Sequence, residues 1–137
     1  MRDSLRVSVV QMTSHNTHAR NVEALIAAAG RAADEGAQML ALPEVAGLMD
    51  RARAAARHGL WIHTGSTPVT GPGDRYLNRA LLITPEGDIA ARYDKIHLFD
   101  AMPEDGKPIG ESKRYAPGAR EVLVDSPFGR LGLSICY

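Results

Sequence analysis

The stretch THARNVEALIAAAGRAADEGAQMLALPE, residues 17–44, decides the fold class, because a helical pattern gives way in it to a strand pattern. Apolar residues at spacings of three and four form one stripe along its first part: Val22, Leu25, Ile26, Ala29 and Ala33. Thr17 or Asn16 is a candidate N-cap, and Gly36 fits the C-terminal end. The second part, residues 37–44, is nearly all apolar, which indicates a strand buried on both faces of a sheet.

Two further strands surround this stretch. LRVSVVQM, residues 5–12, is rich in β-branched residues and partly alternating, which predicts a strand before the helix. Residues 50–58 have the Ala and Arg content of a short helix, and LWIHTGS, residues 60–66, follows as a third strand. TPVTGPGD, residues 67–74, is predicted to be a loop because of its proline and glycine content. Strands that alternate with helices favour parallel pairing at the start of the sheet.

The second half of the chain has the pattern of antiparallel strands. Residues 80–84 and 89–93 flank the turn PEGD, and residues 121–125 and 130–136 flank the turn SPFG, so two hairpins are predicted. Residues 100–118 contain three prolines and no periodicity, which predicts a long loop. The predicted fold class is α/β: a layered, mixed sheet with helices, parallel at its start and antiparallel later.

Composition narrows the setting of the chain. Its 137 residues fit one domain, and Lys+Arg and Asp+Glu are both 16, so the formal net charge of zero speaks against a nucleic-acid or acidic-membrane partner. One cysteine excludes an internal disulfide. The charged start and the lack of a long apolar run speak against a signal peptide and a membrane span. We therefore expect a cytoplasmic protein with no nucleic-acid or membrane partner.

Three polar residues lie at or just after predicted strand ends: Glu44, Lys95 and Cys136. Each alone has an ordinary interpretation, as a solvated carboxylate, an exposed cation and a small buried hydrophobe. Together they supply what a thiol nucleophile needs, which is a base to form the thiolate and a cation to hold an oxyanion. A layered sheet can bring the ends of several strands to one edge, where ligand sites are favoured.

At these residues the sequence resembles the nitrilase, or carbon–nitrogen hydrolase, superfamily. The resemblance runs from Leu5 to Tyr137 and rests on LRVSVVQM, GAQMLALPE, RYDKIHLFD and GRLGLSICY in this order. KIHLFD is closest to the Nit-type, omega-amidase-like branch. Because family members are roughly twice as long, the resemblance implies that residues 1–137 are the N-terminal part of a carbon–nitrogen hydrolase domain. It further implies that the layered sheet is the N-terminal half of a four-layer αββα sandwich.

The resemblance also implies a role for each site residue. Glu44 would be the general base for the thiol and later for water, and Lys95 would stabilise the tetrahedral intermediate. Cys136 would attack an amide carbon, release ammonia and form a thioester. Glu111, in the loop after the lysine, would orient Lys95 or the substrate, although a mobile, solvated carboxylate is the alternative. The backbone N–H of Tyr137 would belong to the oxyanion hole.

These roles predict a cysteine-dependent amidase that cleaves the C–N bond of a small carboxyamide. The resemblance implies no metal or organic cofactor and, for the full-length form, a homo-oligomer of two or more subunits. The five histidines are scattered without convincing metal spacing. A second hypothesis is a catalytically silent binding or assembly module, suggested by the short chain and by the few residues between LPEVAGLM and GLWIHTGS. A flavodoxin-like nucleotide-binding domain ranks below both because no phosphate-binding loop is present.

Overall fold

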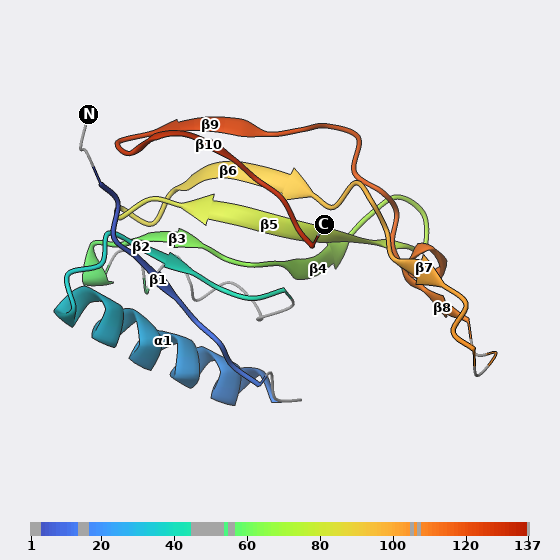
Figure 1. Cartoon of the computed structure of the whole chain (residues 1–137), viewed down its shortest axis with the longest axis horizontal. Helices are drawn as coiled ribbons and strands as arrows, with labels where there is room; N and C mark the ends of the chain where they lie inside the picture. Colours follow the sequence, from blue (N-terminus) through green and yellow to red (C-terminus); the bar gives the residue numbers. More distant parts are fainter. Residues whose placement is uncertain are drawn as a thin grey trace.

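The structure is a computed structural model that describes residues 4–13, 17–44, 54, 57–104, 106 and 108–136. Within these ranges a six-stranded mixed sheet lies between one helix and a two-stranded hairpin, so the molecule has three layers (Figure 1). No helix in the described part is long and apolar enough to cross a membrane.

The central sheet is parallel at its start and antiparallel after that, as the sequence predicts. Strands β1 to β3 pair in parallel, and β5 pairs antiparallel with β3, β4 and β6. The sheet strands β1 to β6 span, in order, Val7–Val9, Met39–Ala41, Trp61–His63, Thr67–Thr70, Tyr76–Ile83 and Ile89–Asp94. The first three strands are shorter than predicted.

Strand β4 corrects the first half of the loop predicted over residues 67–74, while residues 71–74 form a turn as predicted. Strands β3 and β4 follow one another along the same edge of β5, where Ile62 pairs with Ile83 and Thr67 pairs with Arg79. Pro68 is tolerated there because β4 is the last strand of the sheet on that side, where a missing N–H costs no pairing. Proline and glycine content therefore indicated a loop where an edge strand is present.

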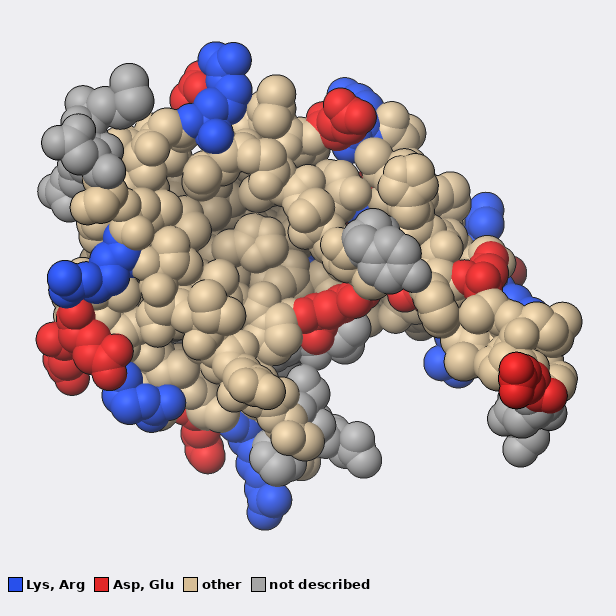
Figure 2. Space-filling view, viewed as in Figure 1, with Lys and Arg blue, Asp and Glu red and all other residues tan. Residues whose placement is uncertain are grey.

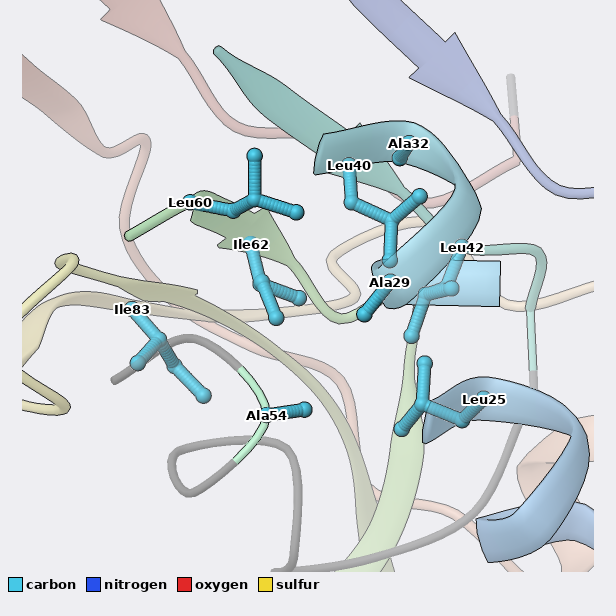
Figure 3. Close-up of a cluster of buried hydrophobic side chains, with 9 residues drawn as sticks. All are labelled: Leu25, Ala29, Ala32, Leu40, Leu42, Ala54, Leu60, Ile62 and Ile83. Atoms are coloured by element: carbon cyan, nitrogen blue, oxygen red, sulfur yellow. The ribbon is translucent and has the colours of Figure 1, made fainter. Parts of the chain in front are cut away.

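Helix α1, His18–Asp34, covers one face of the sheet and confirms the predicted helix. Its buried side packs a compact apolar cluster against the sheet (Figure 3): Leu25, Ala29, Ala32, Leu40, Leu42, Ala54, Leu60, Ile62 and Ile83. The buried face is turned slightly from the predicted stripe, since Ala32 is buried and Ala33 only partly. Thr17 is the N-cap without a side-chain cap bond, Asn16 lies outside the described residues, and Gly36 has a left-handed φ of 73° just past the end.

The opposite face of the sheet is covered by the hairpin of β9, Leu123–Ser126, and β10, Gly129–Gly132. A second apolar cluster lies between the hairpin and the sheet: Met39, Ala80, Leu82, Tyr93, Leu133 and Ile135. The predicted hairpin is confirmed, but its last strand ends at Gly132 and not at Cys136. Only Leu133 adds one more backbone bond, from its N–H to the Val122 carbonyl, before the chain leaves the ladder.

The stretch 100–118 is more ordered than the predicted loop. Strands β7, Asp100–Ala101, and β8, Ile109–Gly110, pair antiparallel and form an arm beside the sheet (Figure 1). A 3-10 turn, η1, follows at Glu111–Lys113. Two-residue strands are too short to produce a periodic pattern, which is why the sequence did not indicate them. Of the helix predicted over 50–58, only Ala54, Arg57 and His58 are described, and they are helical.

Charged residues of both signs are distributed around the outline of the molecule. On the face that Figure 2 shows, Lys and Arg side chains lie next to Asp and Glu side chains along most of this outline. This interspersed pattern agrees with the formal net charge of zero.

Candidate active site

Lys95 follows the last residue of β6 and lies at the centre of a buried ionic cluster. Its N–H donates to the Asn78 carbonyl at 2.9 Å, and its carbonyl accepts from the Gly118 N–H at 2.8 Å. A Cβ atom on Gly118 would lie 2.2 Å from the Asp94 carbonyl oxygen, so this close approach requires glycine. The main chain of Lys95 is therefore fixed on two sides, and its side chain is only 2% exposed.

The ammonium group of Lys95 binds two carboxylates. Its Nζ lies 2.8 Å and 3.1 Å from the two oxygens of Glu111, and 3.2 Å from Oε1 of Glu44. Burial alone lowers the pKa of Lys95, but the hydrogen bonds to Glu111 and Glu44 and their negative charges outweigh it and raise the pKa. Lys95 is therefore a cation at neutral pH.

Glu44 lies three residues after β2, where the sequence predicts a carboxylate at a strand end. Its Oε1 accepts from Lys95 and also from Nδ2 of Asn78, at 2.7 Å. Within the described residues its Oε2 makes no hydrogen bond, and 36% of the side chain is exposed. One carboxylate oxygen is thus held in place while the other stays available to a ligand.

Glu111 is held as firmly as Lys95. Its Oε2 accepts from the Phe99 N–H at 2.7 Å, and its own N–H donates to the Phe99 carbonyl at 3.1 Å. Its carbonyl accepts from the Tyr115 N–H at 2.8 Å, at the end of η1. In this geometry Glu111 is a hydrogen-bonded partner of Lys95, with 23% of its side chain exposed.

Asn78 is a member of this cluster that the sequence analysis missed. It lies in the middle of β5, is 2% exposed, and supplies both the amide that binds Glu44 and the carbonyl that binds Lys95. Its Oδ1 is buried and has no hydrogen-bond partner among the described residues. The predicted strand began only at residue 80, so Asn78 was not recognised as an inward-facing polar residue of the strand YLNRALLI.

Cys136 lies apart from the strand that precedes it. Leu133 and Ile135 are buried under the hairpin and anchor this segment, while the Cys136 side chain is exposed. Its φ is 61°, in the left-handed region that costs a non-glycine residue about 1–2 kcal/mol. Such backbone strain is concentrated at functional sites in proteins.

Two open cavities meet at Cys136. One has a volume of 230 Å³ and is lined by Cys136 together with Lys95 and Phe99. The other has a volume of 140 Å³ and is lined by Cys136 together with Glu44 and His63. The thiol therefore lies between the lysine side and the glutamate side of the ionic cluster, with space for a small molecule on both sides.

Other features of the chain lie outside this cluster. A larger cavity of 540 Å³ is lined by Arg79, Arg92 and Arg120 and contains neither Glu44 nor Cys136. Tyr137, whose N–H is predicted to bind an oxyanion, lies outside the described residues. In the described ranges no three His, Cys, Asp or Glu side chains form a group that could hold a metal ion.

Comparison with known proteins reveals the relatives of this chain. A deaminated glutathione amidase from Yersinia enterocolitica is 41% identical over 61% of the chain, and omega-amidase NIT2 from Homo sapiens is 28% identical over 98%. The matched part of the chain spans only 30% and 55% of the lengths of these two proteins.

Solved structures have the same fold. The C. elegans NitFhit protein superposes with a TM-score of 0.86 and 30% identity, covering 96% of this chain and 37% of that one. An amidase from Nesterenkonia superposes with a TM-score of 0.83 at 21% identity, covering 97% of this chain and 56% of that one. The order of sheet, helix and hairpin is thus a known nitrilase-type arrangement.

A family model with the description carbon–nitrogen hydrolase matches residues 48–137, which is more than half of the chain. The matched part includes Lys95, Glu111 and Cys136, and Glu44 lies just before it. The chain belongs to the carbon–nitrogen hydrolase family.

Proposed function

We propose that the protein hydrolyses the C–N bond of a small carboxyamide with Cys136 as its nucleophile. The observation that carries this proposal is that Cys136 shares one cavity with Glu44 and another with Lys95. A base and a cation on either side of a thiol are what acyl transfer to sulfur requires. The 230 Å³ and 140 Å³ of these cavities suit a small substrate.

In the proposed first step Glu44 removes the proton from the Cys136 thiol, and the thiolate attacks the amide carbon. The C–O π electrons move to oxygen, and the resulting oxyanion is stabilised by the Lys95 ammonium and, as the family resemblance implies, by the Tyr137 N–H. Collapse of this intermediate breaks the C–N bond. Glu44 returns its proton to the leaving nitrogen, so ammonia departs and a thioester remains.

In the proposed second step Glu44 takes a proton from water, and the oxygen of that water attacks the thioester carbon. The C–S bond then breaks, which releases the carboxylic acid product and restores the thiolate. We assign these proton transfers to Oε2 of Glu44, because Oε1 already accepts from Lys95 and Asn78 and Oε2 makes no hydrogen bond within the described residues. Lys95 keeps its proton throughout, since both carboxylates stabilise its charge.

The relatives support the substrate class. The proteins similar to this chain are named deaminated glutathione amidase and omega-amidase, and both names denote amide hydrolysis. In one structure the Nesterenkonia amidase carries the acetamide moiety of fluoroacetamide on its active-site cysteine. We extend this to a cytoplasmic, homo-oligomeric enzyme that acts on a small amide, uses no cofactor and has no nucleic-acid or membrane partner.

Replacement of the thiol tests this proposal. We expect Cys136→Ala and Cys136→Ser to lose amide hydrolysis, measured as ammonia release, by at least about 1,000-fold in kcat, because the proposed mechanism uses the thiol as its nucleophile. Circular dichroism should be unchanged, since the Cys136 side chain is exposed. The control is Glu86→Gln, at an exposed turn position remote from the cluster, which should keep wild-type activity.

Thiol labelling separates the enzyme from the catalytically silent module. A thiol beside a general base should react with iodoacetamide at neutral pH much faster than a free cysteine does, and Glu44→Gln should slow this reaction. Hydrolysis that persists in both Cys136 variants would contradict the thiol mechanism. Slow labelling together with no hydrolysis of any small amide would favour a binding or assembly role.

A further inference from the structure

His63 lines the cavity beside the thiol, and neither the sequence motifs nor the proposed mechanism assigns a role to it. It is the last residue of β3 and lines the 140 Å³ cavity together with Glu44 and Cys136. Side chains alternate along a strand, and Trp61 packs on the hairpin side whereas Ile62 packs on the helix side. His63 therefore projects from the same sheet face that the segment ending at Cys136 crosses.

The ring of His63 is tied to the chain two residues later. The Gly65 N–H donates to Nδ1 of His63 at 3.3 Å. A neutral imidazole that accepts on Nδ1 carries its proton on Nε2. Burial lowers the pKa of His63, so the ring is neutral at pH 7 and able to accept this bond.

Gly65 in turn touches the segment that leads to Glu44. Its φ is 61°, and a Cβ atom on it would lie 1.7 Å from the Pro43 carbonyl oxygen and 2.5 Å from that of Leu42. The Leu42 N–H also donates to the His63 carbonyl at 3.0 Å. The bend after β3 thus lies directly against the last two residues before Glu44.

We propose that His63 is a positioning residue of the site, whose Nδ1 holds the Gly65 bend against Leu42 and Pro43 and so sets the position of Glu44 beside the Cys136 thiol. The consequence for catalysis rests on the function proposed above, because it requires that Glu44 acts as the base. The same ring limits the size of the cavity on the glutamate side.

Protonation should break this arrangement. The imidazolium carries a proton on both nitrogens, so Nδ1 would then face the Gly65 N–H as a second donor and the bond would be lost. The titratable groups that share the cavity with His63 are Glu44 and Cys136, and Lys95 and Glu111 lie behind Glu44. Their titration is common to the wild type and to the His63 variants, so a comparison of the two isolates the effect of His63.

Three substitutions at this position separate the two nitrogens of the ring. The side-chain oxygen of asparagine can take the place of Nδ1, that of glutamine reaches the place of Nε2, and leucine supplies neither. We expect His63→Leu to lower kcat for amide hydrolysis and the rate of Cys136 alkylation by about 10-fold to 100-fold, the loss typical of a misplaced catalytic group. His63→Asn should restore most of both, and His63→Gln should resemble His63→Leu.

The Gly65 amide gives a second readout that does not depend on activity. In ¹⁵N-labelled full chain, the Gly65 amide resonance should shift with the titration of His63, and this pH dependence should vanish in His63→Asn. Thermal unfolding of all three variants controls for a general loss of folding.

The possible outcomes distinguish the two proposals. Rescue by glutamine but not by asparagine would overturn the positioning role and assign direct substrate contact to Nε2. An unchanged alkylation rate in His63→Leu, or a Gly65 amide that ignores the His63 titration, would also overturn it. A wild type that neither hydrolyses amides nor alkylates rapidly would overturn the proposed function, while the Gly65 amide would still decide the contact between His63 and the bend.

Discussion

At the scale of single residues, Lys95 connects the two carboxylates of the candidate site. Its Nζ contacts Glu44, which lies 51 residues earlier in the chain, and Glu111, which lies 16 residues later. A lone lysine after a strand is ordinarily exposed. The two carboxylates bound to Lys95 offset the desolvation cost of burying its charge. The role of Lys95 therefore follows from its neighbours and not from its own position in the sequence.

Lys95→Met should remove both the cation and the link between the two carboxylates. We expect kcat for amide hydrolysis to fall by about 100-fold to 1,000-fold, the cost of losing one oxyanion-stabilising group. The measurement is steady-state ammonia release by the purified full chain. Lys113→Met, an exposed lysine in η1, is the matched control and should retain wild-type kcat. Equal activity of the two variants would contradict the role proposed for Lys95.

At the scale of elements, the bend between β3 and β4 connects the fold to the site. Both strands run along one edge of β5, and the residues between them turn at Gly65 to pass the end of β2. The same bend is in contact with the segment before Glu44 and with the ring of His63. The bend between β3 and β4 thus contacts the segment after β2 that leads to Glu44, which lines the thiol cavity.

Gly65→Ala should be far more damaging than an alanine at another left-handed glycine. Its Cβ would collide with the Pro43 carbonyl, in addition to the conformational cost of about 1–2 kcal/mol. At Gly73, with φ of 60°, a Cβ would meet nothing within 4 Å, so Gly73→Ala should cost only that conformational term. Urea unfolding of both variants measures the two losses. Similar losses would mean that the chain relaxes easily at the bend.

At the scale of the whole molecule, the site depends on tertiary packing from several directions. Glu44 comes from the end of β2, Lys95 from the end of β6 and Glu111 from η1. Cys136 is brought in by the segment that leaves the hairpin on the far side of the sheet from α1. Global unfolding should therefore dissolve the ionic cluster and the thiol environment together.

The ionic cluster should contribute to stability in a pH-dependent way. Because the folded pKa of Lys95 is raised above its ordinary value of 10.5, its contribution is fully present below that pH and is lost as the pH rises through the folded pKa. We expect the difference in unfolding free energy between wild type and Lys95→Met to shrink as the pH rises above the ordinary pKa of 10.5. Urea unfolding at a series of pH values measures it. A difference that stays constant or grows as the pH rises above 10.5 would contradict the raised pKa.

Much of the fold could be predicted because its signals are local. The helix at residues 18–34, the change from parallel to antiparallel pairing in the sheet and both hairpins follow from apolar periodicity and turn residues. The errors fall at strands whose existence or length depends on a partner strand distant in the sequence. Residues 67–70 form an edge strand in spite of Pro68, the short strands β7 and β8 have no pattern of their own, and β10 ends at Gly132.

The candidate site divides in the same way. Glu44, Lys95, Glu111 and Cys136 were predicted from strand ends and from a family resemblance, and the structure brings the first three into direct contact. Asn78 and His63 were missed as site residues. Asn78 binds Glu44, which is distant in the sequence, and His63 binds the bend at Gly65, which no sequence pattern predicts.

The sequence by itself determined the class of fold and, through a family resemblance, supplied the candidate site residues, since side-chain type and apolar periodicity can be read from neighbouring residues in the chain. Only the tertiary structure decided that Lys95 is buried between two carboxylates, that Oε2 of Glu44 makes no hydrogen bond among the described residues, and that Asn78 binds Glu44 while His63 lines the same cavity as Glu44. The physical reason is that charge state, strain and accessibility depend on groups that folding brings together from distant parts of the chain.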